Sequence, residues 1–124
     1  MVAQQADFAI ETTLATKSYV SLIKQAQALG YRVSLLYFWL SSPKVAIERV
    51  AKRVSKGGHH IPSETIELRY HRGISNLYTR YMSICDEWTV VNNMNLIPEV
   101  IAKSDSFGKS IINTEIWDTI FKHQ

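Results

Sequence analysis

The chain has 124 residues, 46% of them hydrophobic, a length that suits one domain with its own core and is short for two. Its formal net charge is +3, with the basic residues concentrated between Arg49 and Arg80, which favours a local anionic ligand over nucleic acid. The single cysteine, Cys85, excludes an internal disulfide, and no apolar run approaches the roughly 20 residues of a membrane span, so we expect a cytoplasmic protein with no membrane partner.

The amino-terminal third reads as a strand, a helix and a strand. Asp7–Thr13 predicts a short strand, and Lys17–Leu29 predicts a helix that ends at Gly30. Val33–Leu40 is almost continuously apolar, which predicts a strand buried on both faces, as in a parallel sheet. This order is typical of a βαβ unit. The apolar stripe of the helix comprises Tyr19, Leu22, Ile23, Ala26 and Leu29.

Two helices separated by glycines follow. Ser42 is a suitable N-cap before Pro43, and the first helix runs to about Lys56, where Gly57-Gly58 ends it. Its inward residues are Ile47, Val50, Ala51 and Val54. A second helix begins at Pro62 and continues to Ile84, with a break near Gly73.

The remaining residues predict a strand, a hairpin and a helix. Trp88–Val91 forms the third strand, and Glu99–Ala102 and Lys109–Asn113 form two strands joined by a turn. Thr114 then caps a terminal helix. Its buried residues are Trp117, Ile120 and Phe121, and the other two tryptophans, Trp39 and Trp88, are also expected in the core.

Four arginines flank the glycine hinge. Arg49 and Arg53 are four residues apart, so they share one helix face, and Arg69 and Arg72 are three apart on the next helix. If the two helices lie antiparallel, all four guanidiniums converge, as in a mobile lid (residues 49–72) that closes over phosphates. The alternative is two solvated basic helix faces.

Polar residues end the first predicted strand. Open α/β sheets bind ligands beyond the carboxyl ends of their strands, so Glu11, Thr12 and Thr13 are candidates for binding a substrate hydroxyl. The alternative is an acidic residue that leads a helix, or a hydrogen-bonded threonine pair.

The other polar clusters give little indication of a functional site. His59 and His60 have no third ligand nearby, so no metal site is expected. Asp86 and Glu87 fit a helix-to-strand turn better than a pair of catalytic acids. No GxSxG motif appears, which gives covalent hydrolysis no support.

These motifs together resemble the zeta-toxin-like P-loop kinases over nearly the whole chain. The matching segments are Phe8–Leu14, Phe38–Pro43, Arg49–Val54, Gly57–His59, Ile61-Pro62, Arg69–Gly73, Asn76-Leu77, Pro98–Lys103 and Ile111–Ile120. The resemblance implies a doubly wound parallel sheet with a helical lid, here followed by the short hairpin and helix. It also implies ATP- and Mg²⁺-dependent phosphoryl transfer to a hydroxyl of a small molecule, UDP-N-acetylglucosamine in the toxins.

The same resemblance assigns roles by position. Glu11 matches the glutamate that contacts the substrate, with Thr12 and Thr13 beside it. Arg49 and Arg53 lie where related kinases place lid arginines near adenine and phosphates. Arg69 and Arg72 match a second lid pair, and Arg53, Arg69 and Arg72 would offset charge on the transferred group.

One part of the family pattern is missing from these residues. No GxxxxGK[ST] loop follows a strand, and neither does the aspartate that acts on the substrate hydroxyl. Gly108-Lys109-Ser110 has the right letters but falls in a turn before a strand. We therefore expect the carboxyl-terminal part of a kinase, which binds no ATP tightly alone and is inactive or completed by an amino-terminal segment in trans. The alternative is a non-catalytic module that binds a phosphate or a nucleotide sugar, or a dimeric interaction module.

The missing strand has a physical consequence. In the implied fold it lies between the strand that carries Glu11 and the strand Val33–Leu40, so its loss leaves two unpaired edges. We expect either direct pairing of these two strands or a homodimer that buries them.

Overall fold

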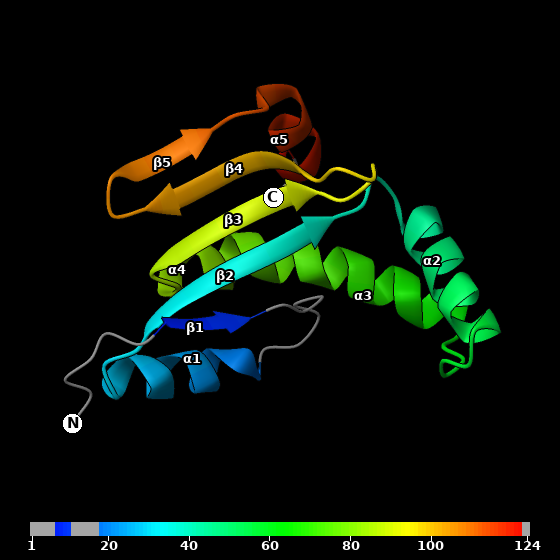
Figure 1. The fold of residues 1–124 in the computed structure, drawn as a ribbon, viewed down its shortest axis with the longest axis horizontal. Coiled ribbons are helices and arrows are strands. Elements are labelled where there is room, and N and C mark those ends of the chain that lie inside the picture. The colour runs from blue at the N-terminus through cyan, green and yellow to red at the C-terminus, as the bar shows by residue number, and fades with distance from the viewer. Residues whose placement is uncertain (1–6, 11–17, 123–124) are drawn as a thin grey trace.

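A five-stranded mixed sheet organises the molecule in the computed structural model, which describes residues 7–10 and 18–122 (Figure 1). The strand order follows the sequence, and the first three strands are parallel while β3, β4 and β5 alternate in direction. The predicted α/β class is therefore confirmed, with a mixed sheet. The strands are β1 (Asp7–Ile10), β2 (Arg32–Trp39), β3 (Glu87–Asn92), β4 (Glu99–Asp105) and β5 (Gly108–Ile111).

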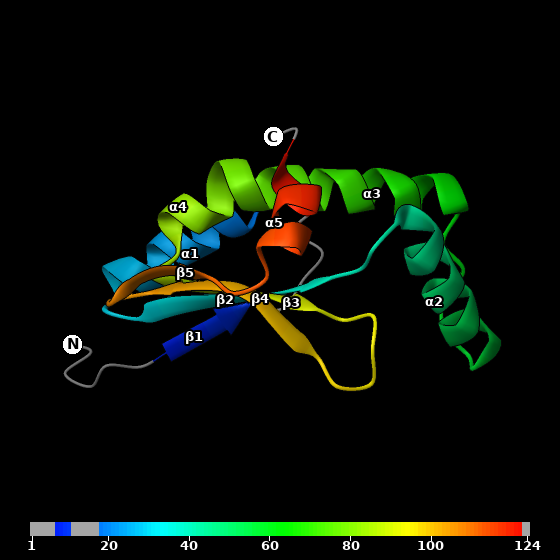
Figure 2. The same cartoon turned by 90° about the horizontal axis from the view of Figure 1, so that it is seen from above.

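The helices lie mainly on one face of this sheet. Figure 2 shows α1, α3, α4 and α5 on the same side, while α2 projects beyond the end of the strands. A doubly wound sheet would carry helices on both faces, and the described residues do not form that arrangement. The helices are α1 (Tyr19–Ala28), α2 (Pro43–Ser55), α3 (Ser63–Asn76), α4 (Met82–Ile84) and α5 (Thr114–Phe121).

The predicted βαβ unit is confirmed. β1 and β2 are parallel and directly paired, from Asp7 opposite Arg32 to Ile10 opposite Leu35. Gly30 ends the connection after α1 with φ 90°, a conformation that glycine adopts without steric cost. Direct pairing is thus the outcome seen for the two strand edges, and a homodimer remains a prediction.

Strand β2 corrects one expectation. Its side chains alternate between buried and accessible, and Leu36 is 36% exposed. Val33, Leu35 and Tyr37 face the helices and are buried, whereas the opposite face has no helix over it among the described residues. The prediction of burial on both faces was wrong because burial of the far face depends on a layer that this part of the chain does not supply.

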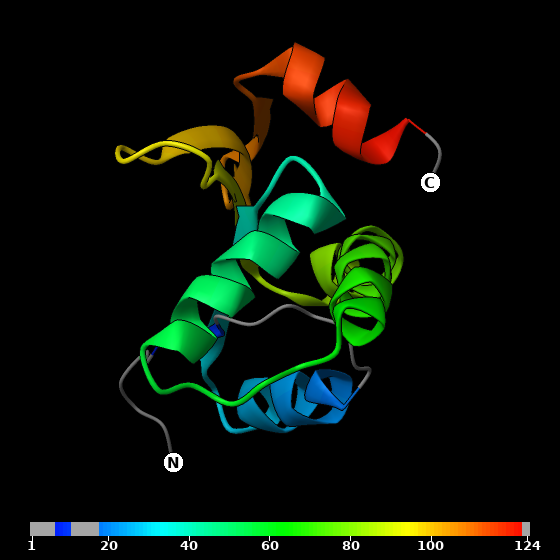
Figure 3. The ribbon, with the colours of Figure 1, turned by 90° about the vertical axis from the view of Figure 1, so that its right-hand side faces the viewer.

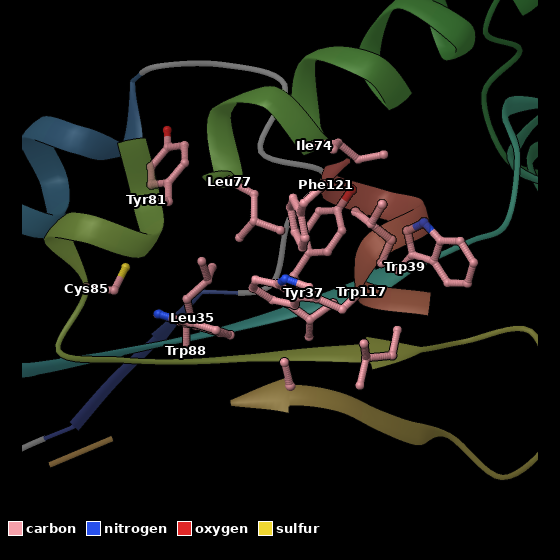
Figure 4. Packing of buried hydrophobic residues seen from close by; sticks show 14 of the residues in the cluster. Leu35, Tyr37, Trp39, Ile74, Leu77, Tyr81, Cys85, Trp88, Trp117 and Phe121 are labelled. Carbon is pink, nitrogen blue, oxygen red and sulfur yellow. The ribbon is translucent and has the colours of Figure 1, made fainter. Parts of the chain in front are cut away.

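One hydrophobic core lies between the sheet and the helices (Figure 4). The three tryptophans are buried, as predicted, and the rings of Trp88 and Trp117 stack with centroids 5.8 Å apart. Helix α1 contributes less than its stripe suggested, because Leu22 and Leu29 are exposed. Other core residues include Ile23, Val33, Leu35, Leu77, Tyr81, Val90, Ile101, Ile120 and Phe121.

The long helical stretch after Pro62 does not break at Gly73. That residue is buried within α3, and the irregularity comes later, as a π-helical turn over Leu77–Tyr81 before α4. A glycine permits a break in a helix without imposing one. The expected break near Gly73 was therefore wrong.

The carboxyl-terminal hairpin and helix are confirmed, with shifted boundaries, since β4 continues past the predicted Ala102 to Asp105. β4 and β5 pair antiparallel around Ser106-Phe107, and α5 follows. The helix cap is Asn113, whose side-chain oxygen accepts a 3.0 Å hydrogen bond from the Ile116 amide. Asn113 has the extended backbone of an N-cap, so Thr114 becomes the first helical residue and the strand ends at Ile111.

Candidate functional site

A cavity of about 490 Å³ lies at the carboxyl ends of the parallel strands β2 and β3. Its walls come from the end of β2, the residue that follows β3, and the two helices α2 and α3. This is the edge at which open α/β sheets bind ligands. The lining residues are Tyr37, Phe38, Leu40, Ala46, Arg49, Val50, Arg53, Ile61, Ile66, Arg69, Tyr70 and Asn93.

Local sequence explains how α2 is placed over the cavity. The Ser42 hydroxyl accepts a 3.3 Å hydrogen bond from the Val45 amide, and Pro43 occupies the first turn, as predicted. At the other end, Gly57 adopts φ 101° and the Gly58 amide donates to the Arg53 carbonyl at 3.0 Å. The chain then returns through Pro62 into α3, so two consecutive helices line the cavity.

Helices α2 and α3 cross instead of running side by side (Figures 1 and 3). The inward residues of α2 predicted from sequence do face α3, where they line a small hollow with Ile66, yet no residue of α2 is buried. Because crossed helices meet over a short stretch, only part of each helix can face the other.

This crossing brings three of the four predicted arginines together. Arg49 and Arg53 of α2 and Arg69 of α3 all line the cavity. Arg72, one turn further along α3, is exposed and is not a lining residue. The antiparallel arrangement on which convergence of all four depended is not what α2 and α3 adopt.

The three lining arginines lack acidic partners within the described part of the chain. The ion pair found there joins Arg32 and Glu87, at the opposite ends of β2 and β3 from the cavity. Guanidiniums that line a hollow without a carboxylate partner create a positive potential and offer hydrogen-bond donors to an anion. The cavity is therefore suited to a phosphate or carboxylate group.

Aromatic and apolar side chains form the rest of the lining. Tyr37 is 5% exposed, and its burial raises the pKa of the phenol, with a smaller contribution from neighbouring Tyr70. Burial also raises the pKa of Tyr70, which a hydrogen bond with the Trp39 side chain partly opposes. Both phenols stay protonated at neutral pH, so they supply neutral polar groups and flat surfaces.

Three predicted site residues lie outside the described part of the chain. Glu11, Thr12 and Thr13 follow β1 directly, and the last residue of β1, Ile10, pairs with Leu35 of β2. Their proposed role toward a substrate hydroxyl remains a prediction.

The histidines and the acidic pair have separate positions. His59 and His60 are exposed on the α2–α3 connection, and no group of three metal-ligating side chains occurs among the described residues. Asp86 accepts hydrogen bonds from the Val33 amide and the Gln27 side chain, and Glu87 pairs with Arg32. These contacts fit the structural interpretation of Asp86 and Glu87.

The lysine of Gly108-Lys109-Ser110 belongs to strand β5. Its ammonium lies 4.9 Å from the centre of the Trp117 ring, a cation–π contact, and it is not a lining residue of the cavity. The three residues form part of a strand and do not open a helix, as the end of a phosphate-binding loop does.

Sequence reasoning missed Tyr37, Tyr70 and Asn93 as site residues. Asn93 follows β3 and donates from its backbone to the Trp39 carbonyl at 2.9 Å. The rule that pointed to Glu11 applies equally to the ends of the next two strands, and it would have indicated Phe38 and Asn93. For Tyr70 the sequence offered only a position at helical spacing among apolar residues, and such spacing indicates core packing instead of a binding role.

No described helix has the length and apolar character that a bilayer crossing requires.

Comparisons with known proteins agree with the resemblance. A family model described as Zeta toxin matches residues 1–98. An uncharacterized protein of Haemophilus influenzae is 30% identical over 69 residues, which make up 56% of this chain and 49% of that protein. The chain thus matches about half the length of this curated relative. No solved structure matches the chain.

Proposed function

The chain belongs to the Zeta toxin family, and from this premise we propose that it is the lid-bearing, phosphate-binding part of a zeta-toxin-like kinase. The observation that supports the proposal best is the set of three arginines, Arg49, Arg53 and Arg69, which line one cavity without acidic partners among the described residues. The ligand is a nucleotide or a nucleotide sugar, bound through its phosphates.

The chemistry of the lining fits such a ligand. Each guanidinium presents a planar fork of donors that matches two phosphate oxygens. The rings of Tyr37, Phe38 and Tyr70 supply an apolar surface for a base or a sugar. In phosphoryl transfer, arginines of this kind stabilise the charge that spreads over the transferred group.

The residues that line the cavity are suited to the phosphates of ATP but not to Mg²⁺. ATP would supply the transferred phosphoryl group, and Arg49, Arg53 and Arg69 would hold its phosphates or those of the acceptor. Among the described residues that line the cavity, none is Asp or Glu, so no carboxylate there is available to bind Mg²⁺. The lysine and aspartate of the family reaction must then come from another segment.

A second candidate function follows from the lack of the family's lysine and aspartate among the described residues of the cavity. Without a phosphate-binding loop in its sequence, the chain can act as a module that binds a phosphate-bearing small molecule and catalyses nothing. The position of Lys109 supports this alternative, because the one Gly-Lys-Ser lysine lies against Trp117 and does not line the cavity. Binding without turnover separates the two functions.

The test is a calorimetric titration of the purified chain with pyrophosphate, ATP and UDP-N-acetylglucosamine. Arg53→Ala should weaken binding about 10- to 100-fold, since a hydrogen bond to a charged group contributes about 1.5–3 kcal/mol. Arg72→Ala removes the same charge from the same lid but outside the cavity, so its affinity should stay close to that of the unchanged chain. Equal losses in the two variants would contradict a defined site.

A turnover assay on the same proteins completes the test. We expect no ATP hydrolysis and no phosphoryl transfer by the chain alone, and transfer only after an amino-terminal kinase segment is added. Turnover that the chain shows alone and loses in Arg53→Ala would mean that another of its elements replaces the missing loop.

A further inference from the structure

Tyr70 joins the lid to the sheet. Its hydroxyl donates a 2.6 Å hydrogen bond to the backbone carbonyl of Leu40, thirty residues earlier in the chain. The side chain of Trp39, the last residue of β2, lies close to the same hydroxyl. One phenol on α3 is thus tied to the joint at which β2 ends and the chain turns toward α2.

Helix α2 has few other means of holding its position. None of the residues of α2 is buried, and the connection from β2 to α2 consists of Leu40, Ser41 and Ser42. The Ser41 amide contacts the Met94 sulfur at 3.3 Å, a weak hydrogen bond. A helix without buried side chains gains little from apolar packing, so single polar contacts at its base have a large share in placing it.

The contact between Tyr70 and Leu40 lies next to both arginine-bearing helices of the cavity. Tyr70 follows Arg69 directly on α3, while Leu40 and Ser42 lead into the helix that carries Arg49 and Arg53. The hydrogen bond between Tyr70 and Leu40 therefore connects the helix that carries Arg69 to the segment that leads into the helix with Arg49 and Arg53.

We propose that Tyr70 is a positioning residue whose hydroxyl fixes the lid against the end of β2 and so keeps Arg69 opposite Arg49 and Arg53. The proposal rests on the proposed function for the identity of the ligand, and on the contacts of Tyr70 alone for the placement of the lid. Without the hydroxyl, the lid samples more open arrangements, and an anion must bind from the fraction in which the arginines face one another.

Tyr70→Phe tests this with the ring retained. In the complete chain, hydrogen exchange of residues 41–62 should become about 3- to 10-fold faster, while exchange in β2 and β3 stays unchanged. The dissociation constant for pyrophosphate should rise by a similar factor. Stoichiometry and the dependence of affinity on salt should not change, because the same three arginines contact the ligand.

Tyr78→Phe is the matched control. Tyr78 lies two turns further along the same helical stretch, is 44% exposed, and packs its ring on Phe121 with centroids 5.2 Å apart. Removal of the Tyr78 hydroxyl should change neither the hydrogen exchange of residues 41–62 nor the affinity for pyrophosphate.

The two readouts also separate the possible failures. A purely structural role for Tyr70 would speed exchange throughout the chain and leave the affinity, measured well below the melting temperature, unchanged; that result would overturn the proposal. Unchanged exchange at 41–62 would overturn it as well. If the unaltered chain binds no pyrophosphate, the proposed function fails, and exchange alone then decides whether Tyr70 places the lid.

Discussion

Asp86 and Val33 are joined by two hydrogen bonds at the start of the parallel pair β2–β3. The Asp86 carboxylate accepts from the Val33 amide at 2.7 Å, and the Asp86 amide donates to the Val33 carbonyl at 2.9 Å. The same carboxylate oxygen accepts from the Gln27 side chain at 3.1 Å. This single acidic residue thus connects the end of α4, the last residues of α1 and the first residues of β2.

Asp86→Ala should lower the free energy of unfolding by about 1–3 kcal/mol, because the Val33 amide then lacks its side-chain acceptor. Guanidinium unfolding followed by circular dichroism measures the change. Asp86→Asn keeps an oxygen acceptor, so it should lower the free energy of unfolding by less than Asp86→Ala does. Asp118, an exposed acid on α5, provides the control, and its replacement by Ala should stay within about 0.5 kcal/mol of the unchanged chain. A loss at Asp86 no larger than at Asp118 would refute the structural role.

Trp117 is the aromatic centre of the carboxyl-terminal half of the core. It is 8% exposed, stacks on Trp88, and lies 4.4 Å from Phe121 between ring centroids. Trp117→Ala should lower the free energy of unfolding by about 3–5 kcal/mol, since it removes the apolar surface and leaves a cavity. Trp117→Phe should cost clearly less, and the near-ultraviolet circular dichroism of the Trp88–Trp117 pair should vanish in both. If the two variants were equally stable, α5 would not be packed as described.

Gly58 is in close contact with a cavity residue. A Cβ atom there would lie 3.1 Å from the Arg53 carbonyl oxygen and 3.2 Å from the Arg53 Cγ. Gly58→Ala should displace Arg53 and weaken pyrophosphate binding roughly 2- to 5-fold, with little effect on unfolding of the core. His59→Ala changes an exposed residue of the same connection and should leave the affinity unaltered. An affinity loss shared by both variants would indicate a general effect on the connection.

Local patterns in the sequence predicted those features that depend on neighbouring residues. Ser42-Pro43 began a helix as expected, and the hairpin after Glu99 formed where turn residues separate apolar runs. Arg49 and Arg53, four residues apart, were expected to share one face of a helix, and both line the cavity. These outcomes depend on caps, turns and helical spacing, which short segments encode.

The features that sequence reasoning missed depend on distant parts of the chain. The exclusion of Arg72 from the cavity follows from the way α2 crosses α3, which spacing within one helix does not encode. The accessibility of Leu36 follows from the lack of a helix over its face of the sheet among residues 7–10 and 18–122. Tyr70 binds a backbone carbonyl at Leu40, and a carbonyl exists at every residue, so no pattern distinguishes that one.

Cys85 predicts how stability depends on alkaline pH. The thiol is 9% exposed, and burial raises its pKa from 9.0 to about 12, with a further contribution from neighbouring Asp86. Because the pKa is higher in the folded chain, the folded state holds its proton over a range in which the unfolded state has lost it. Stability from this group is therefore complete below about pH 9 and is lost as the pH rises toward 12.

Two measurements check this, and the first is thiol reactivity. At pH 8 the native chain should react with iodoacetamide far more slowly than the chain unfolded in guanidinium, since the buried thiol is neither accessible nor ionised. The second is the unfolding midpoint from pH 7 to 10.5. It should be flat to about pH 8.5 and then fall, and Cys85→Ala should remove part of the fall. Tyr37, Tyr70 and Tyr81, whose pKa values burial also raises, contribute to the part that persists above pH 10. A native thiol as reactive as the unfolded one would show that Cys85 is not enclosed between α4 and the sheet.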